Sequence, residues 1–115
     1  MSATVKIHDI EELRRNVEAQ LGQLRASLIG NLDIDINLYD LLMDLSDKIM
    51  NMLYCDGGEY CHIENALIKA YDLASDIGRV GSIVHMPEYA RVGSRISKMI
   101  LYYALGHEDV GGTDE

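Results

Sequence analysis

The chain has 115 residues, a formal net charge of −9 and a hydrophobic share of 48%. Its length suits one domain with its own core, and a single proline together with the apolar share argues against disorder. The excess of acids disfavours direct binding to nucleic acid or to an anionic membrane, because both are negatively charged.

The chain contains no Trp and no Phe, so its core has to be built from Leu, Ile, Val, Met and some of the seven Tyr. Leu, Met and Ala, which are not branched at Cβ, favour helix, so an all-α protein is expected. Residues 1–10 lack an apolar core of the kind a signal peptide needs, and no apolar stretch approaches the roughly 20 residues that span a bilayer. With two cysteines and no export signal, we expect a cytoplasmic protein.

The chain begins with residues 2–8, which alternate weakly and suggest a short extended N-terminal arm. A first helix is expected from Asp9, which can cap it, to Gly30 and Asn31, which suit a helix end. Apolar residues at steps of three and four form one stripe along it: Ile10, Leu13, Val17, Leu21, Leu24 and Leu28.

A second helix is predicted to follow an extended connector at 32–36, capped by Asn37 and running to about Tyr54. Asp56-Gly57-Gly58 marks a break after it. Its expected buried face consists of Leu38, Leu41, Leu42, Leu45, Ile49, Met52 and Leu53.

The third predicted helix runs from about residue 59 or 60 to Ile77, with Gly78 and Gly81 ending it. Pro87 suits the first position of a fourth helix that stops at Gly106. Inside that helix Gly93 is unfavourable by about 1 kcal/mol relative to alanine, which indicates a close approach of another helix. The inward residues expected on it are Tyr89, Val92, Ile96, Met99, Ile100 and Tyr103.

These segments predict an all-α fold, a compact antiparallel bundle of about four helices with short loops. The bundle would form a single domain over residues 1–106. Residues 107–115 would form a flexible acidic tail.

Acidic residues are concentrated in the middle of the chain, where residues 31–76 contain ten acids and two bases. Asp40, Asp44 and Asp47 share one face of the second predicted helix, and like charges at these spacings repel. Such a surface suits a basic protein partner, although an ordinary solvated helix face also explains it. The candidate partner-binding residues are Asp33, Asp35, Asp40, Asp44, Asp47, Asp72 and Asp76.

Cys55, Cys61 and His62 lie close together in sequence between the second and third helices. The wide cysteine spacing and the lack of a second pair of ligands disfavour a zinc site. The simplest interpretation is a turn between two helices, flanked by partly buried cysteines. The sequence does not decide between metal, disulfide and free thiols. We expect no metal, no cofactor and no catalytic residue, since no known catalytic or phosphate-binding motif is present.

Arg91, Arg95 and Lys98 form a small basic stripe on the fourth predicted helix. It is too small for a nucleic-acid patch on so acidic a chain. We expect it to pair with the acidic second or third helix of the bundle, or with another subunit. Tyr89, Tyr102 and Tyr103 suit either a partner-binding patch or the core.

Short length, strong acidity and the absence of both a signal peptide and an enzyme motif resemble the small phage-encoded anti-CRISPR proteins that act on type I systems. The resemblance implies a non-catalytic inhibitor in the host cell cytoplasm that binds a basic nucleic-acid-handling protein, such as a CRISPR effector or nuclease. It transfers no individual residue. Two alternatives remain: a toxin-immunity protein or antitoxin, and a helical homodimer with structural or regulatory function, whose seam would be the apolar stripe of the first helix.

Overall fold

A computed structural model describes residues 9–55 and 62–105. Apart from short connecting turns, this part of the chain is helical, as predicted, and no strand occurs in it. The predicted N-terminal arm, the Asp56–Gly58 break and the C-terminal tail lie outside the described residues. The helices are α1 (Ile10–Gly30), α2 (Ile36–Leu53), α3 (Ile63–Ile83) and α4 (Pro87–Leu105).

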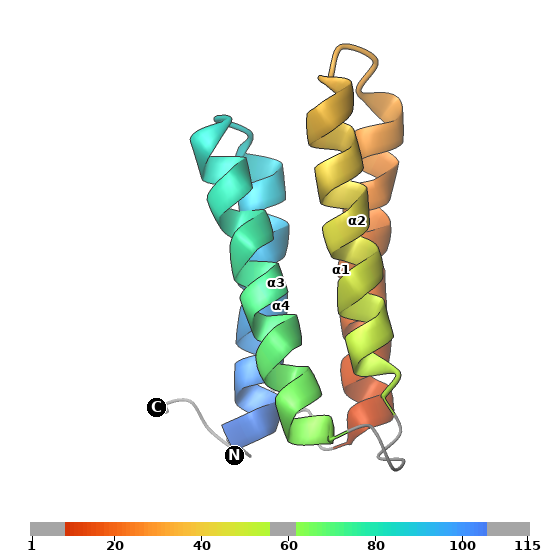
Figure 1. The fold of residues 1–115 in the computed structure, drawn as a ribbon, viewed down its shortest axis with the longest axis vertical. Helices are drawn as coiled ribbons and strands as arrows, with labels where there is room; N and C mark the ends of the chain where they lie inside the picture. The colour runs from red at the N-terminus through yellow and green to blue at the C-terminus, as the bar shows by residue number, and fades with distance from the viewer. Residues whose placement is uncertain (1–8, 56–61, 106–115) are drawn as a thin grey trace, which may run out of the picture.

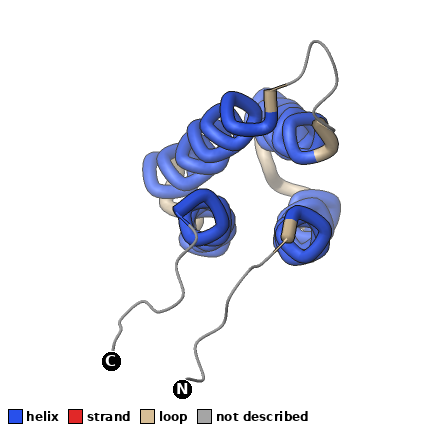
Figure 2. Tube along the Cα trace, turned by 90° about the horizontal axis from the view of Figure 1, so that it is seen from below, coloured by secondary structure: helices blue, strands red, loops and turns tan. Residues whose placement is uncertain are grey.

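The helices form an antiparallel bundle in which successive helices run in opposite directions (Figure 1). Seen along the bundle, they occupy the four corners of a square, with α3 inclined to the others (Figure 2). In the described residues, α1 contacts α2, α2 contacts α3, α3 contacts α4, and α4 closes the ring on α1. This up-down order follows from the short connections, because a short loop joins antiparallel neighbours.

The core lies along the axis of this square. The predicted stripe of α1 is buried from Leu13 to Leu28, and its five fully enclosed residues are at most 1% exposed. The prediction that this stripe forms the seam of a homodimer is therefore wrong, because the other helices of the bundle already cover the stripe. The core residues expected on α2 and α4 are mostly buried as well, and α3 adds four further residues. The expected ones are Leu42, Leu45, Ile49, Leu53, Tyr89, Val92, Ile96 and Ile100, and those from α3 are Leu67, Ala70, Ala74 and Ile77.

Two helix starts differ in how well they were predicted. Asp9 caps α1 as expected, because its Oδ1 accepts the backbone N–H of Glu12 at 2.8 Å. The prediction that Asn37 caps α2 is wrong: Asp35 accepts the N–H groups of Asn37 and Leu38 at 3.0 and 3.2 Å. Residues 31–35 form a turn instead of an extended connector, so the cap and the start of α2 lie two residues earlier than expected.

The prediction that Gly78 and Gly81 end the third helix is also wrong, since α3 continues to Ile83. Neither glycine adopts a positive φ, so both stay in right-handed helical geometry. The chain reverses instead at His85, whose φ is 59°. At the other end, α3 begins at Ile63, later than expected, with no side-chain cap from His62.

Small residues let α3 and α4 approach each other closely. A Cβ on Gly93 would lie 2.4 Å from the backbone N of Gly78, and one on Gly81 would lie 2.3 Å from the backbone N of Ala90. The close approach predicted from Gly93 is thus confirmed. The glycines of α3 serve this contact and do not terminate the helix.

Arg14 joins the start of α1 to the end of α2. Its Nε donates to the carbonyl of Leu53 at 2.5 Å and a terminal nitrogen donates to that of Cys55 at 3.3 Å. Its guanidinium lies 4.9 Å from the ring centroid of Tyr54, a cation–π distance. A cation here satisfies carbonyl groups that a helix C-terminus leaves without intrahelical partners.

Candidate binding surfaces

The acidic face of α2, defined here as Asp40, Asp44 and Asp47, points away from the core. All three residues are exposed, as are Asn37 and Asn51 beside them. The side chains buried on the opposite side are Leu42, Leu45, Ser46, Ile49 and Leu53. The prediction that the three aspartates share a solvent-facing side of one helix is therefore confirmed, although Leu41, expected in the core, is 44% exposed.

Asp33 and Asp35 precede this face in the turn between α1 and α2, and both are exposed. Asp35 is committed to capping α2, so replacing it would change the helix start as well as the surface charge. Asp33 forms no ion pair among the described residues and adds to the negative charge at the start of α2.

Two aspartates of the acidic face already form ion pairs. Asp44 lies 3.0 Å from Lys48 one turn later, and Asp47 lies 2.5 Å from a terminal nitrogen of Arg25 on α1. Asp44, Lys48 and Asp47 are largely exposed and Arg25 is 38% exposed, and pairs between exposed groups contribute only about 0–1 kcal/mol. A basic side chain of a partner can therefore replace Lys48 or Arg25 in these pairs with a small loss of free energy. Asp40 has no such pair within the described part of the chain.

Asp72 and Asp76 belong to a different helix from the acidic face. Both lie on α3, and Asp76 pairs with Arg79 one turn later at 2.8 Å. The sequence grouped them with the α2 aspartates by charge alone, but they are carried by the neighbouring element.

The basic stripe of α4 does not pair within the bundle as expected. Arg91, Arg95 and Lys98 are exposed, and none forms an ion pair in the described residues. The ring order explains the missing pairs with α2, because α4 packs against α3 and α1 and lies diagonally across from α2. It does not explain the missing pairs with α3, which is a direct neighbour of α4. Pairing of the stripe with another subunit stays a prediction. Tyr89 is fully buried, so it belongs to the core and not to a surface patch.

The cysteine segment is only partly described. Cys55 is disulfide-bonded; the other cysteine of the chain, Cys61, lies outside the described residues. Residues 9–55 and 62–105 contain no group of three His, Cys, Asp or Glu side chains arranged to hold a metal ion. Within the same ranges, no helix is both long and apolar enough to cross a membrane.

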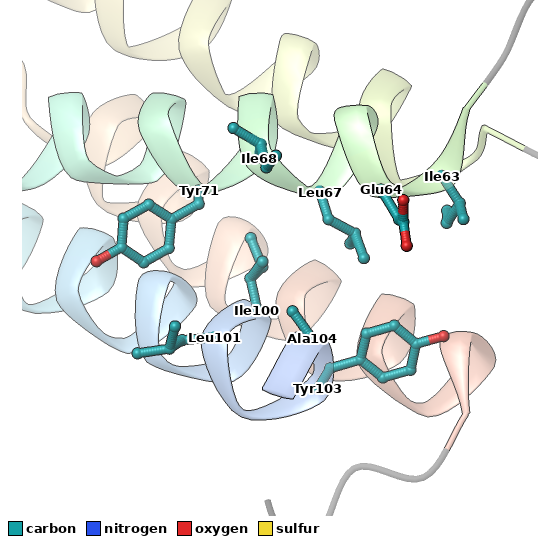
Figure 3. Close-up of a pocket in the computed structure, with 9 residues that line it drawn as sticks. All are labelled: Ile63, Glu64, Leu67, Ile68, Tyr71, Ile100, Leu101, Tyr103 and Ala104. Atoms are coloured by element: carbon teal, nitrogen blue, oxygen red, sulfur yellow. The ribbon is translucent and has the colours of Figure 1, made fainter. Parts of the chain in front are cut away.

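An apolar groove between α3 and α4 was not predicted from the sequence. It has a volume of about 660 Å³. Leu67 and Ile100 form its inner wall, and Tyr71 points from α3 toward Leu101 of α4 (Figure 3). Ile68 and Leu101 lie outside the core stripes of their helices, which is the sequence signal that could have indicated it. The remaining lining residues are Ile63, Glu64, Ile68, Tyr103 and Ala104.

Comparison of the chain with protein-family models, with curated proteins and with solved structures gives no match. The candidate surfaces therefore have to be interpreted from their own chemistry.

Proposed function

We propose that this protein is a non-catalytic inhibitor that binds a basic nucleic-acid-handling protein through the acidic face of α2. The observation that carries the proposal is the placement of Asp40, Asp44 and Asp47 on one exposed side of a well-packed helix. Proteins that handle nucleic acid present Arg and Lys surfaces to phosphates, and a rigid row of carboxylates is complementary to such a surface. The chemistry fits a basic protein partner, and the resemblance to anti-CRISPR proteins implies one such as a CRISPR effector or nuclease.

The rigidity of the surface supports this proposal. Leu42, Ile49 and Leu53, on the inner side of α2, are fully buried. The helix that carries the carboxylates is therefore held in position by the core before any partner arrives, which lowers the entropy cost of binding. Asp33, in the preceding turn, extends the negative surface toward the end of α1.

The triple variant Asp40→Asn/Asp44→Asn/Asp47→Asn tests the proposal. We expect it to lose most of its affinity for the basic partner, because it removes three charges and keeps the shape of the side chains. Asp35 is left in place since it caps α2. A matched control, Glu11→Gln/Glu18→Gln/Glu88→Gln, removes three carboxylates from α1 and α4 and should bind like the unaltered protein.

The measurement has two stages. Tagged protein is first used to capture partners from host lysate at low and at high salt, and retained proteins are identified by mass spectrometry. The nucleic-acid binding or cleavage activity of the captured protein is then assayed with each variant. Inhibition that survives the triple substitution, or a captured protein whose activity is unaffected, would contradict the proposal. Capture of a cognate toxin would instead favour the immunity-protein alternative.

A further inference from the structure

One half of the outer face formed by α3 and α4 exposes a cluster of bulky apolar side chains. Ile68 is 61% exposed, Tyr71 37% and Leu101 39%. All three line the apolar groove between α3 and α4 (Figure 3). A contiguous apolar patch of this kind is uncommon on a monomer and marks an interaction surface.

The other half of the same face is lined mostly by small side chains, although Ile83, which is 74% exposed, also lines it. A second hollow adjoins the first and shares Tyr71 and Leu101 with it. Its walls are mostly serine, glycine and alanine, since this is the region where α3 and α4 approach closely. The small residues that line it are Ser75, Gly78, Ser82, Ala90, Gly93, Ser94 and Ser97.

Charges of opposite sign lie in the two halves. Glu64 lines the apolar half, in the first turn of α3, whereas Arg79 and Lys98 line the half with small residues. Along α3, Glu64 is seven residues before Tyr71 and Arg79 is eight residues after it. The face is therefore acidic and bulky on one side of Tyr71, and basic and hollow on the other.

We propose that this face binds a second copy of the chain, with the two α3 helices antiparallel across a two-fold axis near Tyr71. This symmetry places the bulky half of each copy over the hollow half of the other. It also brings Glu64 near Arg79 of the partner subunit, twice per dimer. A two-fold interface requires such self-complementarity, because the same patch supplies both sides.

The size of the face fits a dimer. At about 1.5 Å per residue and about 10 Å per helix width, α3 and α4 together offer roughly 600 Å² in projection. A standard stable interface uses roughly 800 Å² of accessible surface per partner, and accessible area exceeds projected area. Since α2 is not part of this face, each dimer would leave two acidic faces free, and dimerisation does not depend on the proposed inhibitory function.

Sedimentation equilibrium of the purified protein, without any partner, tests the proposal between about 1 µM and about 1 mM. We expect a mass approaching twice 12.9 kDa as the concentration rises. Ile68→Asp and Leu101→Asp should abolish dimerisation, because each places a charge in the apolar half. Leu32→Asp, at a position 93% exposed in the α1–α2 turn, is the control and should dimerise normally.

Charge reversal tests the symmetry itself. Glu64→Arg and Arg79→Glu should each raise the dimer dissociation constant about tenfold, since each replaces two attractive contacts with two repulsive ones. The double variant Glu64→Arg/Arg79→Glu should restore dimerisation. Two controls are matched: Glu88→Arg also reverses an acid in the first turn of a helix, and Lys48→Glu also breaks an exposed pair within a helix.

Circular dichroism of every variant ensures that lost dimerisation is not lost folding. A protein that stays monomeric over the whole range would overturn the proposal and leave the face to a different partner. A dimer that tolerates Ile68→Asp and Leu101→Asp would overturn it as well. Failure of the double charge reversal to restore association would reject the antiparallel two-fold arrangement.

Discussion

Gly93 and Gly22 are both helical glycines, but a methyl group would meet opposite surroundings at the two positions. A Cβ on Gly93 would lie 2.4 Å from the N of Gly78 and 2.6 Å from the carbonyl oxygen of Ala74. Both neighbours are backbone atoms of a packed helix, so neither can turn aside as a side chain would. Gly22 lies on the exposed side of α1 with nothing within 4 Å of such a Cβ.

Alanine substitutions at these two positions are therefore expected to change stability in opposite directions. Gly93→Ala should lower the free energy of unfolding by about 1–3 kcal/mol or more, because α4 must move away from α3. Gly22→Ala should raise it by about 0.5–1 kcal/mol, through the higher helix propensity of alanine. Urea denaturation of both variants measures the effect. A Gly93→Ala protein as stable as the unaltered chain would contradict the close packing of α3 and α4.

At the scale of the helices, Arg14 links the start of α1 to the end of α2, and no sequence pattern indicated this contact. Its side chain is 12% exposed and holds the carbonyl groups of Leu53 and Cys55. The neighbouring Arg15 is exposed and forms no ion pair in the described part of the chain. The two arginines are adjacent in sequence but differ in what they stabilise.

Arg14→Ala should lower the free energy of unfolding by about 2 kcal/mol, because charged hydrogen bonds to the end of α2 are lost and its carbonyl groups are left without a donor. Arg14→Lys should recover only part of this, since an ammonium group cannot reach two carbonyls with the fork of a guanidinium. Arg15→Ala is the control and should stay within about 0.5 kcal/mol. Thermal and urea unfolding give the comparison; equal effects at the two positions would contradict the role of Arg14.

Apolar periodicity predicted the four helices and their antiparallel packing, because each buries one stripe. It failed at positions where tertiary contacts determine where a helix begins or ends. Gly78 and Gly81 resemble helix ends but lie inside α3, since the packing of α4 requires residues without a Cβ there. Asp35 rather than Asn37 caps α2, because both side chains suit a cap and only the course of the preceding turn distinguishes them.

For the candidate surfaces too, the features set by helical spacing were predictable and those set by tertiary contacts were not. The shared face of Asp40, Asp44 and Asp47 follows from helical spacing alone, so it was predicted correctly. The groove between α3 and α4 requires knowing which helices are neighbours and which of their faces remains uncovered. Ile68 and Leu101 are unremarkable as single residues, and only the ring order of the bundle places them side by side.

At the scale of the whole molecule, repulsion between acidic groups is only partly offset by ion pairs. The chain carries a net charge of −9. The ion pairs in the described residues include Asp44 with Lys48, Asp47 with Arg25 and Asp76 with Arg79, and every group in them is at least partly exposed. Such pairs contribute little, whereas like charges on one compact molecule repel over distances set by the ionic strength. The core, and not surface electrostatics, therefore supplies the stability.

This balance predicts that salt stabilises the protein. Raising sodium chloride from about 10 mM to about 150 mM shortens the screening length from about 30 Å to about 8 Å, and we expect Tm to rise by about 2–5 °C. The variant Asp40→Asn/Asp44→Asn/Asp47→Asn is three units less negative and should show a smaller rise. Differential scanning calorimetry of both proteins at matched salt concentrations measures the two Tm changes. A Tm that falls with salt would mean that attraction within ion pairs outweighs repulsion between the acids. The acidic face would then stabilise the fold, and its charge would not indicate a binding surface for a basic partner.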